Sequence, residues 1–128
     1  MIHEEICTYE VCKLAKDKGF NEYEACNHIY EDDEQWHTLT TYTNAKGIDW
    51  SKDKFTVAPT QSILQRWLRE EKSIIIELKY SDSTESWRPF WSWYIYNNLG
   101  FTLEIGDYSA TYELALEDAL KYALENLI

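Results

Sequence analysis

The sequence is poor in residues that interrupt regular structure, with four glycines and two prolines among its 128 residues. No glycine stands in a G-x-G-x-x-G or Walker spacing, so we predict no cradle for nucleotide phosphates. No apolar run approaches the roughly 20 residues that cross a bilayer. The first five residues, Met-Ile-His-Glu-Glu, lack the basic and apolar regions of a secretory signal. We therefore expect a cytoplasmic protein without a membrane span.

Cysteine is also scarce. The three cysteines, Cys7, Cys12 and Cys26, are odd in number, and two of them fall within a predicted helix. Free thiols in a reducing compartment are typical of this pattern, whereas a disulfide framework is not.

Basic residues are few relative to acidic ones. Twelve Lys and Arg stand against 23 Asp and Glu, which gives a net charge of −11. The acidic excess lies in residues 1–40 and 81–128, while residues 41–80 carry a small excess of bases. Because an acidic surface repels phosphate backbones and anionic lipids, we expect no direct nucleic-acid or membrane binding. A basic protein partner is compatible with this charge, although solubility explains it more simply.

What the sequence does have is material for a core. Hydrophobic residues make up 45% of the chain and aromatic residues 16%, which is too much for a disordered polymer. A chain of this length buries about two thirds of its unfolded surface, enough for one core. We expect a single domain over residues 1–128.

The first half of the chain predicts a helix and a hairpin. Residues 4–17 have apolar residues at helical spacing, and Gly19 followed by Phe20 is a typical helix stop. Residues 25–41 predict a hairpin that turns at the acidic run 31–34. Its expected register pairs Ile29 with Trp36, His28 with His37, and Cys26 with Leu39. Residues 42–58 are weakly patterned; residues 49–54 predict an irregular surface segment, and we expect Trp50 and Phe55 to anchor this part of the chain to the body.

The second half predicts a helix, three strands and a final helix. Thr60 is the expected N-cap of a helix ending near Lys72, which leads into a strand over residues 74–80. Residues 90–97 and 101–105 predict a strand pair, and residues 112–127 an amphipathic helix capped by Thr111 or Ser109. We therefore predict an α+β fold with one antiparallel sheet of about five strands and three helices, in the order α-β-β-α-β-β-β-α.

Cys26, His28 and His37 are the only cluster of soft metal ligands. The expected hairpin register places them on one face, and zinc binds residues of these types. Neighbouring side chains on one strand face run parallel, however, and do not converge. We predict no metal site and no cofactor, and a metal-dependent enzyme is an alternative.

Carboxylate pairs carry little information in so acidic a chain. Glu77, Glu104 and Asp107 stand beside predicted strands and are the best placed for acid–base chemistry. Glu77 and Glu104 are instead expected to mark the solvent face of the sheet. No G-x-S-x-G nucleophile motif is present, so we assign no catalytic residue.

The richest segment is the aromatic run from Phe90 to Tyr96. Strand alternation places Trp91, Trp93 and Ile95 on one face. The other face carries Phe90, Ser92, Tyr94 and Tyr96, and we predict that its aromatic residues share the sheet face of Ile74, Ile76 and Leu78. Both faces are apolar, so the strand is either central in the fold, closed by a homodimer, or exposed as an aromatic platform. The residues predicted for partner binding are Trp87, Trp91, Trp93 and Ile95.

Three short motifs carry a resemblance. Ala-Pro-Thr at residues 58–60 precedes a helix containing Trp67-Leu68, Leu14 precedes Gly19-Phe20, and the last helix begins Thr111-Tyr112-Glu113. In these the chain resembles a broad group of small uncharacterised proteins of phages, prophages and gut bacteria, although residues 21–57 depart from that pattern. The resemblance implies mobile-element ancestry and an α+β fold. It carries no established activity.

Together these observations favour a small accessory protein of phage or prophage type that acts by binding a protein, with a homodimer as one form. One alternative is an acidic decoy of a nucleic-acid-binding protein. The other is an enzyme that depends on a metal or on carboxylates.

Overall fold

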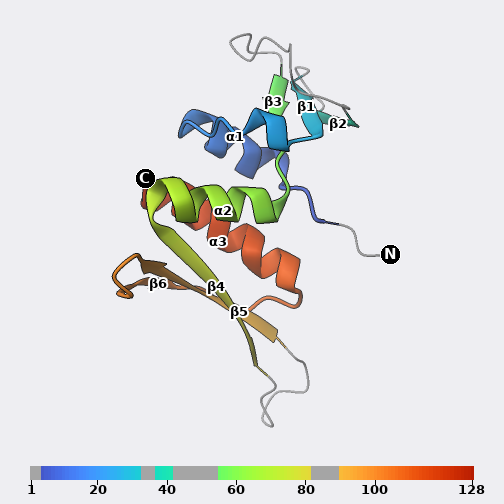
Figure 1. Ribbon diagram of the computed structural model, residues 1–128. Coiled ribbons are helices and arrows are strands. Elements are labelled where there is room, and N and C mark those ends of the chain that lie inside the picture. The colour runs from blue at the N-terminus through green and yellow to red at the C-terminus, as the bar shows by residue number, and fades with distance from the viewer. Residues whose placement is uncertain (1–3, 33–36, 42–54, 82–89) are drawn as a thin grey trace. The chain divides into compact units, whose positions relative to one another are not determined.

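The chain folds into helices and antiparallel strands that form two compact units, residues 1–64 and 65–128 (Figure 1). The structure is a computed structural model, and it describes residues 4–32, 37–41, 55–81 and 90–128. Within these ranges it has three α-helices, a short 3-10 helix (η1, Tyr23–Ala25) and six strands in two three-stranded sheets. The α+β class is confirmed, and the single sheet of about five strands is corrected to two sheets. Whether the units fold as one domain stays a prediction.

The N-terminal unit begins with an extended segment and then the helix α1, Tyr9–Asp17. Thr8 caps the helix, because its hydroxyl accepts a hydrogen bond from Val11 N at 3.4 Å. Gly19 has φ +93°, as the predicted helix stop requires. The helix starts later than predicted because the preceding residues pair with another segment instead: Cys7 N donates to Pro59 O at 3.0 Å.

The N-terminal sheet has the order β2-β1-β3, with strands β1 (His28–Asp32), β2 (His37–Thr41) and β3 (Phe55–Val57). The hairpin is confirmed but its predicted register is wrong, since His28 pairs with Thr41, and His37 pairs with Asp32. The acidic residues 31 and 32 extend β1 instead of forming the turn, which moves the pairing. β3 lies in the weakly patterned residues 42–58, directly after the segment 49–54 that was predicted to be irregular, and it was not predicted as a strand. Trp36 and Trp50 lie outside the described residues.

The helix α2, Gln61–Lys72, follows its predicted cap, and Thr60 Oγ1 accepts from Ile63 N at 3.3 Å. A single residue, Ser73, joins it to β4, Ile74–Ser81. Ser73 has φ +57°, the left-handed conformation that usually falls to glycine at a helix end.

The C-terminal sheet has the order β4-β5-β6, with β5 at Phe90–Asn97 and β6 at Thr102–Ile105. The turn between β5 and β6 is confirmed: Asn97 Oδ1 accepts from Leu99 N at 2.9 Å and from Phe101 N at 3.0 Å. Gly100 supplies a φ of +85° there. The last helix, α3, spans Tyr112–Asn126, and Thr111 caps it by accepting from Leu114 N at 3.1 Å.

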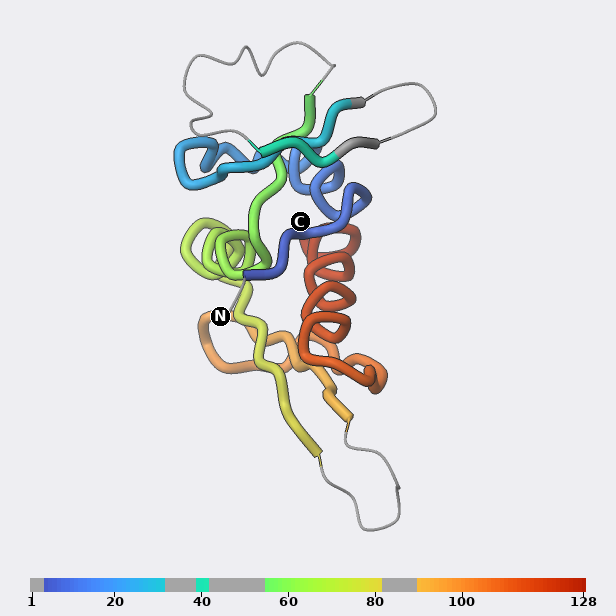
Figure 2. Tube along the Cα trace, turned by 90° about the vertical axis from the view of Figure 1, so that its right-hand side faces the viewer, coloured from blue at the N-terminus to red at the C-terminus, as the bar shows by residue number. Residues whose placement is uncertain are grey.

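Helix α3 covers one face of this sheet (Figures 1 and 2), which we call the inner face. The register pairs Ile76 with Ile95 and Leu78 with Trp93, so these residues share the inner face. The opposite, outer face carries Ile75, Glu77 and Lys79 of β4, Phe90, Ser92, Tyr94 and Tyr96 of β5, and Ile105 of β6. The prediction that Phe90, Tyr94 and Tyr96 share the face of Ile74, Ile76 and Leu78 is therefore wrong. The inner face, which carries Trp91 and Trp93, packs on α3, and the outer face, which carries Tyr94 and Tyr96, does not.

The buried face of α3 is mostly small residues and leucines. The sequence predicts one apolar face made of Tyr112, Ala115, Leu116, Ala119, Ala123 and Leu127. Four of these residues are buried, whereas Tyr112 is 39% exposed and Leu127 is partly exposed, and Leu120 and Leu124 are buried instead. The three alanines have small side chains, and they leave room for the large inner-face side chains of the sheet to pack against the helix.

Candidate functional site

The residues predicted for partner binding lie mainly in the core of the C-terminal unit. Ile95 is fully buried, and Trp93 is 5% exposed. Trp91 is partly buried between two rings, at 5.1 Å from Tyr80 and 5.1 Å from Tyr112. Trp87 lies outside the described residues. Trp93 and Ile95 therefore hold α3 on the sheet and present little surface to a partner.

Trp93 is held between a helix and a turn. Its ring lies 5.5 Å from that of Tyr122 on α3. The backbone of Gly106 covers the indole so closely that an added Cβ would overlap ring atoms Cε2, Nε1 and Cδ2. Gly106 N also donates to Trp93 O at 2.8 Å. The contact requires glycine at this position.

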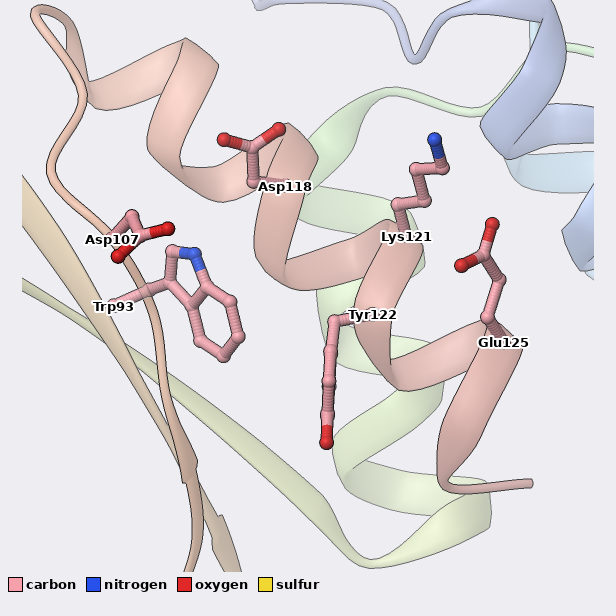
Figure 3. A pocket seen from close by; sticks show the side chains of 6 residues that line it. All are labelled: Trp93, Asp107, Asp118, Lys121, Tyr122 and Glu125. Carbon is pink, nitrogen blue, oxygen red and sulfur yellow. The ribbon is translucent and has the colours of Figure 1, made fainter.

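A shallow cavity of about 240 Å³ opens beside this ring (Figure 3). Its lining residues are Trp93, Asp107, Asp118, Lys121, Tyr122 and Glu125. Ser109 Oγ donates to Asp118 Oδ2 at 3.4 Å. Three carboxylates beside aromatic rings suit a small cationic group, and the ammonium of Lys121 offsets part of their charge.

Glu104 is not on the solvent face as predicted; it lies on the inner side, opposite Ile95. The Tyr122 hydroxyl donates to Glu104 Oε2 at 2.8 Å, and Ile105 N donates to Glu104 Oε1 at 3.1 Å. Both hydrogen bonds favour the charged carboxylate and lower the pKa of Glu104, and the first also raises the pKa of Tyr122. Glu77 is on the outer face. Because the sheet separates them, Glu77 and Glu104 cannot act as a catalytic pair.

The outer face is an ordered aromatic surface. The rings of Tyr94 and Tyr96 are nearly parallel, at 8° and 6.3 Å between centroids. Lys79 Nζ lies 5.8 Å from the Tyr94 ring centroid, within reach of a cation–π contact. Partial desolvation, together with the charge and hydrogen bond of Glu77, raises the pKa of Tyr96. The face therefore combines flat rings with one charge of each sign.

Apolar side chains extend this surface along the β5–β6 turn and β6. Ile105 is 55% exposed, and the exposed set also includes Leu99, Phe101 and Leu103. Tyr108, exposed as well, packs against Phe90 in a tilted arrangement, with 4.2 Å between centroids and 50° between the ring planes. Several exposed apolar side chains on neighbouring segments are typical of interaction surfaces.

The three soft ligands do not come together. His37 lies four positions along β2 from Thr41, the partner of His28, which is about 13 Å at the rise of a strand. The Cys26 thiol is buried and donates to Glu22 O at 3.4 Å. Burial, then the Cys12 thiol and Glu22, raise the pKa of Cys26 to about 12, so it is a poor metal ligand and nucleophile. Within the described ranges no group of three His, Cys, Asp or Glu could hold a metal ion.

Comparison with protein-family models, with curated proteins and with solved structures gives no match to this chain. No helix in the described part of the chain is long and apolar enough to cross a membrane.

Proposed function

We propose that this protein is a small accessory protein that acts by binding another protein through the outer face of its C-terminal sheet. The observation that carries the proposal is the contrast between the two faces: α3 packs on the inner face, whereas on the outer face Tyr94 and Tyr96 stay partly exposed and Ile105 is 55% exposed. A half-covered sheet usually turns a polar face to water. This outer face is aromatic instead, and aromatic residues supply most of the binding energy in protein interfaces.

The charge of the outer face supports the same proposal. Although the chain has a net charge of −11, the outer face carries Glu77 and Lys79, one charge of each sign. Because the outer face is almost neutral, no cluster of like charges has to be brought together when a partner binds to it. The phage or prophage origin of the protein, and its cytoplasmic location, rest on the sequence alone.

The decoy and the enzyme have no comparable support. A decoy needs carboxylates in a contiguous stripe, and Lys121 interrupts the acids on the cavity side of α3. An enzyme needs a converging set of reactive groups, and Glu77, Glu104 and Asp107 do not converge, because Glu77 and Glu104 lie on opposite faces.

The test is a comparison of captured proteins. Immobilised wild type and the double variant Tyr94→Ser/Ile105→Ser are exposed to the same bacterial lysate. Leu114→Ser serves as the matched control, since Leu114 on α3 is 56% exposed and Ile105 is 55% exposed. We expect at least one protein that wild type and the control retain and the double variant loses, followed by direct calorimetric titration of that purified protein.

A partner held equally by all three proteins would contradict the use of the outer face. The double variant must keep the wild-type circular dichroism spectrum, which shows that it is folded. Its unfolding midpoint is expected to fall somewhat, because Tyr94 is only partly exposed and its truncation removes buried apolar area.

A further inference from the structure

β4 is an edge strand of the C-terminal sheet, so one side of its backbone has no neighbouring strand in that sheet. In the antiparallel ladder, alternate residues direct their backbone groups to opposite sides. Trp91 and Ser109 exchange hydrogen bonds, and Trp93 O accepts from Gly106 N, so Trp91 and Trp93 face the β6 side. Ser92, Tyr94 and Tyr96 consequently face β4, where they pair with Lys79, Glu77 and Ile75. The backbone groups of Ile76, Leu78 and Tyr80 must then point outward, away from β5.

One hydrogen bond confirms this direction. Gln65 Nε2, from α2, donates to Ile76 O at 3.0 Å on the outward side. For the outward N–H and C=O groups of Leu78 and Tyr80, the described part of the chain supplies no partner. β4 is eight residues long, and a long edge strand with unpaired backbone groups is a template for another strand.

The sequence of β4 is complementary to itself. If a second β4 pairs with it antiparallel about a two-fold axis at Leu78, the outward groups of the two Leu78 residues bond to each other. Ile76 then pairs with the partner's Tyr80, after the Gln65 amide has released Ile76 O, and Glu77 lies opposite the partner's Lys79. Two opposite-charge pairs form across the axis, in the close, non-hydrogen-bonded positions.

The charges of Glu77 and Lys79 also disfavour the neighbouring registers. A shift that moves the axis to Lys79 places two ammonium groups opposite each other, and a shift to Glu77 places two carboxylates opposite each other. Like charges directly opposite destabilise a strand pair. The axis at Leu78 alone brings unlike charges together, and it also covers Tyr80, which is 49% exposed.

We propose that a second copy of this chain pairs with the edge of β4, antiparallel and with Leu78 on the two-fold axis, so that the two C-terminal sheets become continuous. This inference goes beyond the proposed function, because the contact uses the edge of β4 and not the outer face of the sheet. The contact is isologous, as in most homodimers.

The experiment is a charge exchange read by sedimentation equilibrium at low salt. Glu77→Lys and Lys79→Glu each turn two attractive pairs into two repulsive ones, and we expect each to weaken dimerisation at least tenfold. The double variant Glu77→Lys/Lys79→Glu restores unlike pairs and is expected to recover the wild-type dimerisation constant. A double variant that stays as weak as the single variants overturns the register.

A cross-link gives an independent readout. Directly paired residues have Cα atoms about 5.5 Å apart, which suits a disulfide. Leu78→Cys should form a disulfide-linked dimer under mild oxidation, while Ile105→Cys, an exposed control, should not. The native thiols of Cys7, Cys12 and Cys26 are buried and do not interfere.

Wild type that remains monomeric at millimolar concentration, with no Leu78→Cys cross-link, overturns the inference. That result leaves the capture of other proteins by the outer face intact. Conversely, a β4 dimer that survives Tyr94→Ser/Ile105→Ser, without any captured partner, separates the failure of the proposed function from the success of the edge contact.

Discussion

The two faces of the C-terminal sheet differ in what covers them, although one strand supplies both. On the inner face of β5, Trp93 and Ile95 are buried beneath α3. On the outer face, Tyr94 and Tyr96 stack on each other and remain partly exposed. Both sets are apolar, so hydrophobicity alone does not separate them. Whether an apolar residue of β5 belongs to the core or to the surface therefore depends on whether a helix packs on its face.

The largest effect is expected when one isoleucine on each face is truncated, which tests how closely the two faces are packed. Ile95→Ala leaves a cavity under α3 and should cost about 4 kcal/mol of unfolding free energy. Ile75→Ala, at a partly exposed position on the outer face, should cost roughly 1 kcal/mol, since less buried area is lost there. Urea unfolding measures both. Equal costs would mean that the outer face is as closely packed as the inner one.

A second change tests the inner face without truncation. Gly106→Ala drives a methyl group into the Trp93 ring, and we expect a loss of about 3 kcal/mol from overpacking. Gly100→Ala is the control, because it has a positive φ but no atom within 4 Å of the added Cβ. It should cost about 1 kcal/mol. The order of the two unfolding midpoints decides whether steric overlap or backbone conformation dominates.

A third change leaves both faces intact and acts on the backbone between α2 and β4. Ser73 has φ +57°, where a Cβ is unfavourable, so Ser73→Gly should raise the unfolding free energy by about 1 kcal/mol. Ser73→Ala keeps the Cβ and should not stabilise. A gain in both variants would instead point to the loss of the hydroxyl.

The smallest expected effect concerns the polar contact on the inner face. Tyr122→Phe removes the hydrogen bond to Glu104 and should slightly destabilise the protein near pH 7. Because this bond lowers the folded pKa of Glu104, the stabilisation is full above the ordinary carboxyl pKa of about 4.3. It disappears as the pH falls through the folded pKa. Unfolding midpoints of the two proteins should therefore converge in acid; a difference that persists there would assign it to packing.

Local signals in the sequence predicted much of the fold. Thr60 and Thr111 each cap a helix, and Gly19 and Gly100 take the left-handed conformations expected of them. These positions depend on a few neighbouring residues, which the sequence displays directly. For the same reason the ends of α2 and α3 were close to the prediction.

Pairing between distant segments could not be predicted in the same way. β5 is apolar on both faces, so a shift of one residue places either of its faces beside the apolar face of β4 and leaves the pattern equally good. The register of β1 with β2 depended on whether residues 31 and 32 turned or paired. β3 is three residues long, and its partner β1 precedes it by more than 20 residues. For these reasons the sequence predicts an exposed aromatic surface at Trp91 and Trp93, on the inner face, instead of at Tyr94 and Tyr96, on the outer face.

The cysteines have a consequence for how the chain opens. Cys7, Cys12 and Cys26 are all buried in the N-terminal unit, and residues 65–128 contain no cysteine. The rate at which a thiol reagent modifies the native protein therefore follows opening events in residues 1–64 alone. Comparing the free energy of those openings with that of global unfolding in urea shows whether the two units unfold together. Equal values correspond to one cooperative domain, and a lower value for the thiols corresponds to a unit that opens by itself.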